Sequence, residues 1–179
     1  MKNYQRLKGL IAASFTPMDA HGKVNLFAID KYADLMANSG MTGVFVCGTT
    51  GESLSLTTKE RKNILEQWIK SANHRFKVIA HVGSNSQFEA MELARHATEA
   101  GADAIASMAP CFFKPGSVKE LIAFFAPIAE SAKELPFYYY NMPSMTGVSL
   151  SVAAFLEEGK KVMPNLVGTK FTHNNLMEM

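Results

Sequence analysis

Residues 43–72 read GVFVCGTTGESLSLTTKERKNILEQWIKSA and contain one complete strand-turn-helix unit. The unit begins with a short apolar run over residues 43–47, which is typical of a strand that is buried on both faces. Thr57 and Glu60 then have the spacing of a capping box, which predicts the start of a helix. The apolar residues that follow recur at spacings of three and four, as in a helix that packs on a sheet. They are Ile64, Leu65, Trp68, Ile69 and Ala72.

The same unit repeats along the chain. Apolar runs follow one another about every 31 residues, close to the roughly 250 residues divided by eight units of a TIM (β/α)8 barrel. Ser86 with Glu89, and Ser117 with Glu120, repeat the capping-box spacing and predict two more helix starts. Strands that alternate with helices predict a parallel sheet with the helices outside it. The predicted strands cover residues 10–15, 43–47, 77–82, 103–107, 136–141 and 165–170.

The number of units falls short of a complete barrel. Six strands and five full helices account for the chain, and residues 174–179 look like the first turn of a sixth helix. We therefore expect an incomplete TIM (β/α)8 barrel, one domain over residues 1–179 that is truncated before the last two βα units. Either the chain is a fragment of a longer protein, which we favour, or something else covers the open, apolar edges of a six-stranded sheet.

Composition excludes several classes of function. With 47% hydrophobic residues, a chain of 179 residues can form a core, and 18 basic against 16 acidic residues leave a net charge of +2 without a basic stripe. Nucleic acid is therefore not an expected partner. The longest apolar stretches have about six residues, where a membrane span needs about 20, and no signal cleavage pattern follows the N-terminus, so we expect a cytoplasmic protein. Cys47 and Cys111 belong to no metal-binding or disulfide pattern.

In a barrel of this kind, reactive groups collect at the carboxyl ends of the strands. The segment GTTGE, residues 48–52, follows the second strand there. Its two glycines allow a tight turn that exposes amides beside the hydroxyls of Thr49 and Thr50, a set of donors suited to a carboxylate. A helix-entry turn with hydroxyl caps is the alternative. The segment lacks the lysine of a P-loop, so a nucleotide phosphate is a poor candidate.

Lys170 and Tyr140 stand at the ends of the sixth and fifth predicted strands. A free lysine amine is almost entirely protonated at neutral pH, so nucleophilic chemistry needs a site in which desolvation favours the neutral form. The apolar residues before Lys170 predict such a buried strand end, although a strand-end lysine is also common as a surface charge. Tyr140 has the same two interpretations, a proton carrier or a packed ring with its hydroxyl in water.

Three motifs together resemble a known family. GTTGE at 48–52, YYYNMPSMTGV at 138–148 and GTK at 168–170 resemble, in order and interval, the pyruvate-dependent class I aldolases, which include N-acetylneuraminate lyase and dihydrodipicolinate synthase. The resemblance covers essentially the whole chain. It implies a (β/α)8 barrel, usually a homotetramer, that binds pyruvate or a 2-keto sugar acid as a lysine Schiff base and uses no metal or other cofactor.

The resemblance also implies a role for individual residues. Lys170 takes the place of the Schiff-base lysine, and Tyr140 that of the tyrosine that moves protons. Thr49 and Thr50 take the place of the carboxylate site. Thr172 would hydrogen-bond the substrate near the carbon that becomes the aldehyde. A protonated imine withdraws electrons from the adjacent carbon, so cleavage of the neighbouring C–C bond leaves a stabilised enamine.

One position bears on the branch of the family, and a second departs from the pattern of many relatives. Met145 stands where dihydrodipicolinate synthases typically have an arginine, so it favours the sialic-acid lyase branch, which cleaves N-acetylneuraminate to N-acetylmannosamine and pyruvate. Phe113 stands where many relatives have a tyrosine, and it lacks the hydroxyl that an inter-subunit proton relay would use. Two alternatives stay open: another pyruvate-dependent aldolase, such as a dihydrodipicolinate-synthase-like enzyme, or a catalytically inactive half-barrel that serves as an interaction module.

Overall fold

A computed structural model describes residue 4 and residues 7–178, so residues 1–3, 5–6 and 179 of the predicted domain lie outside the described residues. Six parallel strands form one sheet in sequence order, and the predicted strands are confirmed to within two residues at each end. The strands are β1 (Ile11–Ala13), β2 (Gly43–Val46), β3 (Lys77–His81), β4 (Ala104–Met108), β5 (Phe137–Asn141) and β6 (Leu166–Phe171).

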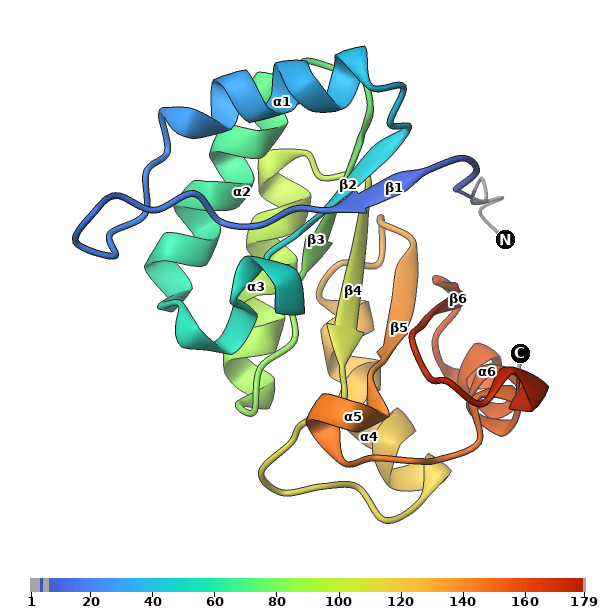
Figure 1. The fold of residues 1–179 in the computed structure, drawn as a ribbon. Coiled ribbons are helices and arrows are strands. Elements are labelled where there is room, and N and C mark those ends of the chain that lie inside the picture. Colours follow the sequence, from blue (N-terminus) through green and yellow to red (C-terminus); the bar gives the residue numbers. More distant parts are fainter. Residues whose placement is uncertain (1–3, 5–6, 179) are drawn as a thin grey trace.

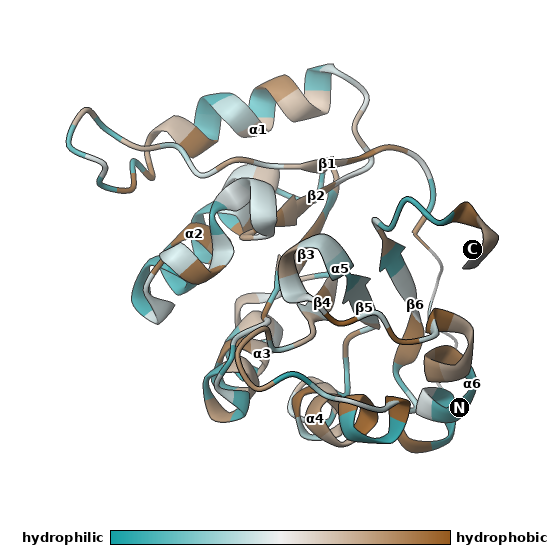
Figure 2. Ribbon diagram, turned by 60° about the horizontal axis from the view of Figure 1, so that its bottom comes forward, coloured by the Kyte–Doolittle hydropathy of each residue, from teal (hydrophilic) through white to brown (hydrophobic). Residues whose placement is uncertain are grey.

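The long helices lie on one side of the sheet. Figure 1 shows a helix after each strand up to β5, and Figure 2 shows these helices in an arc outside the curved sheet. This arrangement confirms the incomplete TIM barrel. The helices are α1 (Ala28–Asn38), α2 (Thr58–Ala72), α3 (Gln87–Ala100), α4 (Val118–Glu130), the short α5 (Pro143–Thr146) and α6 (Val152–Val162). The expected start of a further helix is a single 3-10 turn, Leu176–Glu178.

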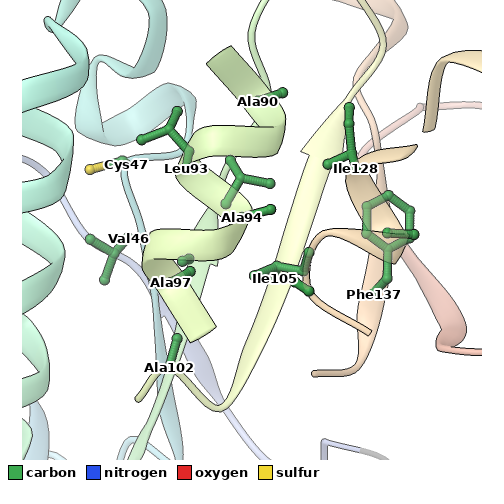
Figure 3. Close-up of a cluster of buried hydrophobic side chains, with 14 of the residues drawn as sticks. Val46, Cys47, Ala90, Leu93, Ala94, Ala97, Ala102, Ile105, Ile128 and Phe137 are labelled. Carbon is green, nitrogen blue, oxygen red and sulfur yellow. The ribbon is translucent and has the colours of Figure 1, made fainter. Parts of the chain in front are cut away.

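The main core fills the layer between the sheet and the helices. Figure 3 shows side chains of α3 next to Val46 of β2 and Ile105 of β4. Three of the four are alanines, which let the helix approach the sheet closely, and their spacing of three and four keeps them on one face. They are Ala90, Leu93, Ala94 and Ala97.

Helices α2, α3 and α4 begin at the predicted hydroxyl caps. The box is reciprocal in α2, where the Glu60 carboxylate accepts the amide of the N-cap residue at 2.9 Å. In α3 and α4 the carboxylates accept elsewhere, Glu89 from the Ser84 hydroxyl at 2.5 Å and Glu120 from the Gly116 amide at 2.7 Å. The reciprocal half of the prediction is wrong there, because nearby donors outside the box bind the carboxylates.

Strands β1 and β6 are the two edges of the sheet. Leu10, directly before β1, is 67% exposed, so apolar surface lies beside an edge, as the sequence predicts for an incomplete barrel. Within the part of the chain that the structure describes, no helix has the length and apolar character needed to cross a membrane.

Candidate active site

The predicted site residues of β5 and β6 lie side by side in a strand pair. Tyr140 and Lys170 are register partners, and partners in a parallel pair point to the same side of the sheet. Both side chains lie on the inner side, away from the helices. The Lys170 Nζ is 4.0 Å from the centroid of the Tyr140 ring and 5.2 Å from that of Phe45. The amine is therefore turned toward the aromatic interior of the half-barrel.

Tyr140 connects this amine to the segment after β2. The tyrosine is 3% exposed, and its hydroxyl is 3.1 Å from the Thr49 Oγ1 in a hydrogen bond that either group can donate. Thr49 begins a 3-10 turn, Thr49–Gly51, that follows β2. An amine and an alcohol from two strand ends thus both contact the phenol of a third, Tyr140. This combination can form an imine and move a proton next to it.

The backbone around Thr49 is held in an unusual conformation. Cys47, Glu52 and Ser53 all have positive φ angles, of 55°, 67° and 29°, although none is glycine. Strained residues of this kind persist only where the surroundings determine them, and they cluster at functional sites. Gly48 is required for a different reason, because a Cβ there would lie 2.4 Å from the Phe45 ring.

His81 is a site residue that the sequence analysis missed. It is the last residue of β3 and is buried, with its Nδ1 2.9 Å from the Cys47 carbonyl oxygen and its ring edge-on to Tyr140 at 5.6 Å between centroids. Burial lowers the pKa of His81 to about 3, and the charges of Arg61 and Lys170 act in the same direction. The signal in the sequence is a single histidine inside an apolar strand, at the inward-facing parity of Ile79.

The other predicted residues lie at the rim of this cluster. Thr50 follows Thr49 in the same turn and is exposed. Thr172 is also exposed, and its hydroxyl donates to the Asn141 carbonyl at 2.6 Å and lies 2.8 Å from the Met142 Sδ. The threonine side chain therefore ties the end of β6 to the end of β5.

Lys170 itself is half-buried. The prediction that Lys170 stands at the end of a buried strand is wrong: of the residues of β6 only Leu166 is buried, because β6 is an edge strand and has a neighbour on one side only. The inner side of the sheet forms a hollow of about 300 Å³, within the range of small-molecule sites. Its lining is mostly apolar and comprises Leu7, Ile11, Ala13, Phe45, Ile79, Ala106, Tyr138, Thr169 and Lys170.

A metal site is not evident in the part of the chain described, where no three His, Cys, Asp or Glu side chains are grouped to hold an ion.

The sequence model of the Dihydrodipicolinate synthetase family matches residues 6–179. The chain belongs to the dihydrodipicolinate synthetase family. This result confirms the resemblance that the three motifs predict.

Several proteins similar to this chain are named N-acetylneuraminate lyase. N-acetylneuraminate lyase A of Xenopus laevis is 44% identical over 97% of this chain and 58% of its own length. The structures of N-acetylneuraminate lyase from Proteus mirabilis (40% identical) and Aliivibrio salmonicida (44% identical) both match with a TM-score of 0.94 over 97% of this chain, and over 59% and 58% of their own. The chain thus spans less than two thirds of the length of these relatives.

The two residues at which the sequence departs from the pattern of many relatives, Met145 and Phe113, lie at the surface. Met145, on the short α5, is 60% exposed, and Phe113, in the loop between β4 and α4, is 85% exposed. The Phe113 ring packs only edge-on against Phe112, at 4.9 Å between centroids, among the ring contacts of the described residues. Neither side chain offers a charge or a hydroxyl to a substrate.

Proposed function

We propose that this protein is a carbon-carbon lyase that cleaves N-acetylneuraminate reversibly to N-acetylmannosamine and pyruvate. The observation that carries the proposal is the contact of the Lys170 amine with the Tyr140 ring, whose hydroxyl is hydrogen-bonded to Thr49. The names of the similar lyases support the choice of the sugar acid. Met145 supports it too, since a thioether cannot pair with the second carboxylate that an arginine would bind.

Lys170 and Tyr140 divide the chemistry between them. The Lys170 Nζ attacks the keto carbon of the open-chain substrate, and Tyr140 gives its proton to the departing hydroxyl, so that loss of water leaves an iminium and a Tyr140 phenolate. This cation draws the electrons of the C3–C4 bond, which breaks to give an enamine, while the Tyr140 phenolate takes the proton of the C4 hydroxyl. Tyr140 then returns this proton to C3, and water hydrolyses the iminium to release pyruvate. The Lys170 Nζ lies 4.0 Å from the centroid of the Tyr140 ring, so the positive charge of the iminium develops next to the group that takes the proton.

The threonines orient the substrate in this proposal. Thr49 and Thr50 bind the carboxylate through their hydroxyls and amides, which brings the keto carbon next to Lys170. Thr172 already donates its proton to the Asn141 carbonyl, so its oxygen is an acceptor for a substrate hydroxyl near the carbon that becomes the aldehyde. No metal or other cofactor takes part in these steps.

We further propose that residues 1–179 belong to one barrel domain and that the enzyme is a homotetramer. We also propose that it acts in the cytoplasm and that its ligands are small keto acids. The family resemblance supports the tetramer. Two free thiols, Cys47 and Cys111, support a reducing compartment. Light scattering of the full-length protein measures the assembly directly, and a monomer would contradict it.

The substrate is tested with the full-length protein. We expect turnover of N-acetylneuraminate and none of aspartate semialdehyde with pyruvate, and turnover of the second pair alone would refute the proposed substrate. Borohydride with pyruvate should add one pyruvate-derived mass at Lys170. Lys170→Ala should abolish the adduct; an adduct in that variant, or none in the folded wild type, would refute the Schiff-base lysine.

A further inference from the structure

One polar side chain in the interior has no role in the chemistry proposed above. His81, at the end of β3, is buried and points to the same side of the sheet as Tyr140 and Phe45. Its ring lies edge-on to Tyr140, at 5.6 Å and 89°, and tilted to Phe45, at 5.9 Å. A ring in contact with the two aromatic groups that also face Lys170 can influence their position.

The hydrogen bonds of His81 determine which nitrogen carries the proton. The Cys47 carbonyl oxygen can only accept, and it lies 2.9 Å from the His81 Nδ1, closer than the Arg61 Nη2 at 3.5 Å, so Nδ1 carries the proton and donates it to this carbonyl. The Nε2 is then the acceptor for the Met108 amide at 3.4 Å, and the Ser53 Oγ, 3.0 Å from Nδ1, is a further partner. His81 thereby links β4 to both ends of the segment that carries Thr49.

The surroundings keep this ring neutral and fixed. The Arg61 guanidinium donates to the carbonyls of His81 and Gly83, at 2.8 and 2.9 Å, and its charge opposes a second proton on the ring. A Cβ at Gly83 would lie 2.7 Å from the His81 Nε2, so the backbone closely encloses the ring. A histidine that stays neutral is a poor acid or base at physiological pH and is suited to hold other groups in place.

We infer that His81 is a positioning residue, which holds the Thr49 turn and the Tyr140 ring in the arrangement that proton transfer requires. The inference rests on the proposed function, since it concerns the same tyrosine. It extends that function because it names what keeps the proton carrier in place: the hydrogen bond from His81 on β3 to the strained segment after β2. When such a group is misplaced by a fraction of an ångström, the reaction slows by more than substrate binding weakens.

Two variants of the same shape separate the hydrogen bond from the packing. In His81→Asn the amide nitrogen takes the place of Nδ1 and can donate to the Cys47 carbonyl, whereas His81→Leu has no donor. The readout is exchange of the pyruvate methyl protons in D2O, followed by NMR. In this reaction the Lys170 iminium loses a methyl proton to the Tyr140 phenolate, the phenol exchanges this proton with D2O, and the enamine then takes up a deuteron from it.

We expect His81→Leu to slow exchange by about tenfold or more, and His81→Asn to stay within about threefold of the wild type, the size of effect that one buried hydrogen bond gives. Borohydride trapping of pyruvate at Lys170 should change by less than about twofold in both. His21→Leu, in an exposed turn, is the control and should exchange at the wild-type rate. Equal slowing in folded Asn and Leu variants would overturn the inference.

A double variant tests whether His81 acts through Tyr140. In a Tyr140→Phe background, His81→Leu should slow exchange no further, whereas multiplication of the two effects would overturn the inference. If His81→Leu does not fold, His81→Gln, which keeps an acceptor for Met108 but not the Nδ1 donor, takes its place in both comparisons. A wild type that exchanges pyruvate protons but leaves N-acetylneuraminate intact refutes the proposed substrate alone, and one that does neither refutes both proposals.

Discussion

Tyr140→Phe removes one oxygen atom from the centre of the candidate site. The ring contacts should remain, because phenylalanine retains the aromatic faces that meet Phe45 at 5.3 Å and the Lys170 amine at 4.0 Å. The variant loses the hydrogen bond to Thr49, 3.1 Å long in the wild type. It therefore separates the proton-carrying role of the hydroxyl from the packing role of the ring.

The expected loss of stability is small. A single neutral hydrogen bond contributes about 0.5–1.5 kcal/mol, and the half-buried Thr49 can bind water in its place. We therefore expect the free energy of unfolding to fall by about 1 kcal/mol. A positioned acid or base contributes about 10² to 10⁴ to the rate, which is about 3–5 kcal/mol of the barrier. The effect on kcat should exceed the effect on stability severalfold.

The assay follows pyruvate release from N-acetylneuraminate by the full-length protein and compares kcat with the extent of borohydride trapping. We expect kcat to fall by about 10² or more and trapping to change little. Tyr139→Phe is the matched control, because Tyr139 is the neighbouring residue of β5 and faces the helix side, next to Phe155. An equal loss of trapping and kcat, or the same loss in the Tyr139 variant, would refute the role of the Tyr140 hydroxyl.

Two further predictions concern the support of the site. Because the pKa of His81 is about 3 in the fold and about 6.5 in the unfolded chain, protons bind the unfolded state first as the pH falls below 6.5. This group should therefore lower the free energy of unfolding by about 1.4 kcal/mol per pH unit between pH 6.5 and pH 4. Urea unfolding at several pH values measures this free energy, and in His81→Asn its decline with falling pH should be smaller by that amount. The same decline in the wild type and the variant would contradict the prediction. Gly48→Ala should destabilise the fold by about 1–3 kcal/mol through its clash with Phe45, whereas Gly116→Ala, whose Cβ would meet Glu120 no closer than 3.6 Å, should be near neutral in thermal unfolding.

The fold could be predicted from the sequence because each unit repeats the same signals. The runs 43–47 and 77–82 are apolar enough for burial on both faces, and they end at turns or hydroxyl caps that fold locally. The burial of β6 could not be predicted in this way. It depends on how many neighbours a strand has, and the composition of residues 165–170 does not contain that information.

Part of the candidate site could be predicted for a related reason. Lys170, Tyr140 and Thr49 stand at strand ends, and parallel strands bring their ends to one edge of the sheet. The role of His81 could not be predicted from the sequence, because it depends on contacts with residues from two other strand ends. These residues are Cys47, Ser53 and Met108. A histidine in an apolar run indicates only that a partner exists somewhere in the fold.

The side of the sheet on which the amine lies depends on one irregularity. Phe137 pairs with Leu166, but Tyr138 pairs with Gly168, so β6 has one extra residue, Val167, at this point. In a regular ladder Tyr140 would pair with Thr169, and Lys170 would pair with the next residue of β5 and face the helices. A one-residue shift exchanges the two faces of a strand, so the bulge turns Lys170 inward. The reactivity that we propose for the lysine therefore depends as much on this register shift as on the GTK motif.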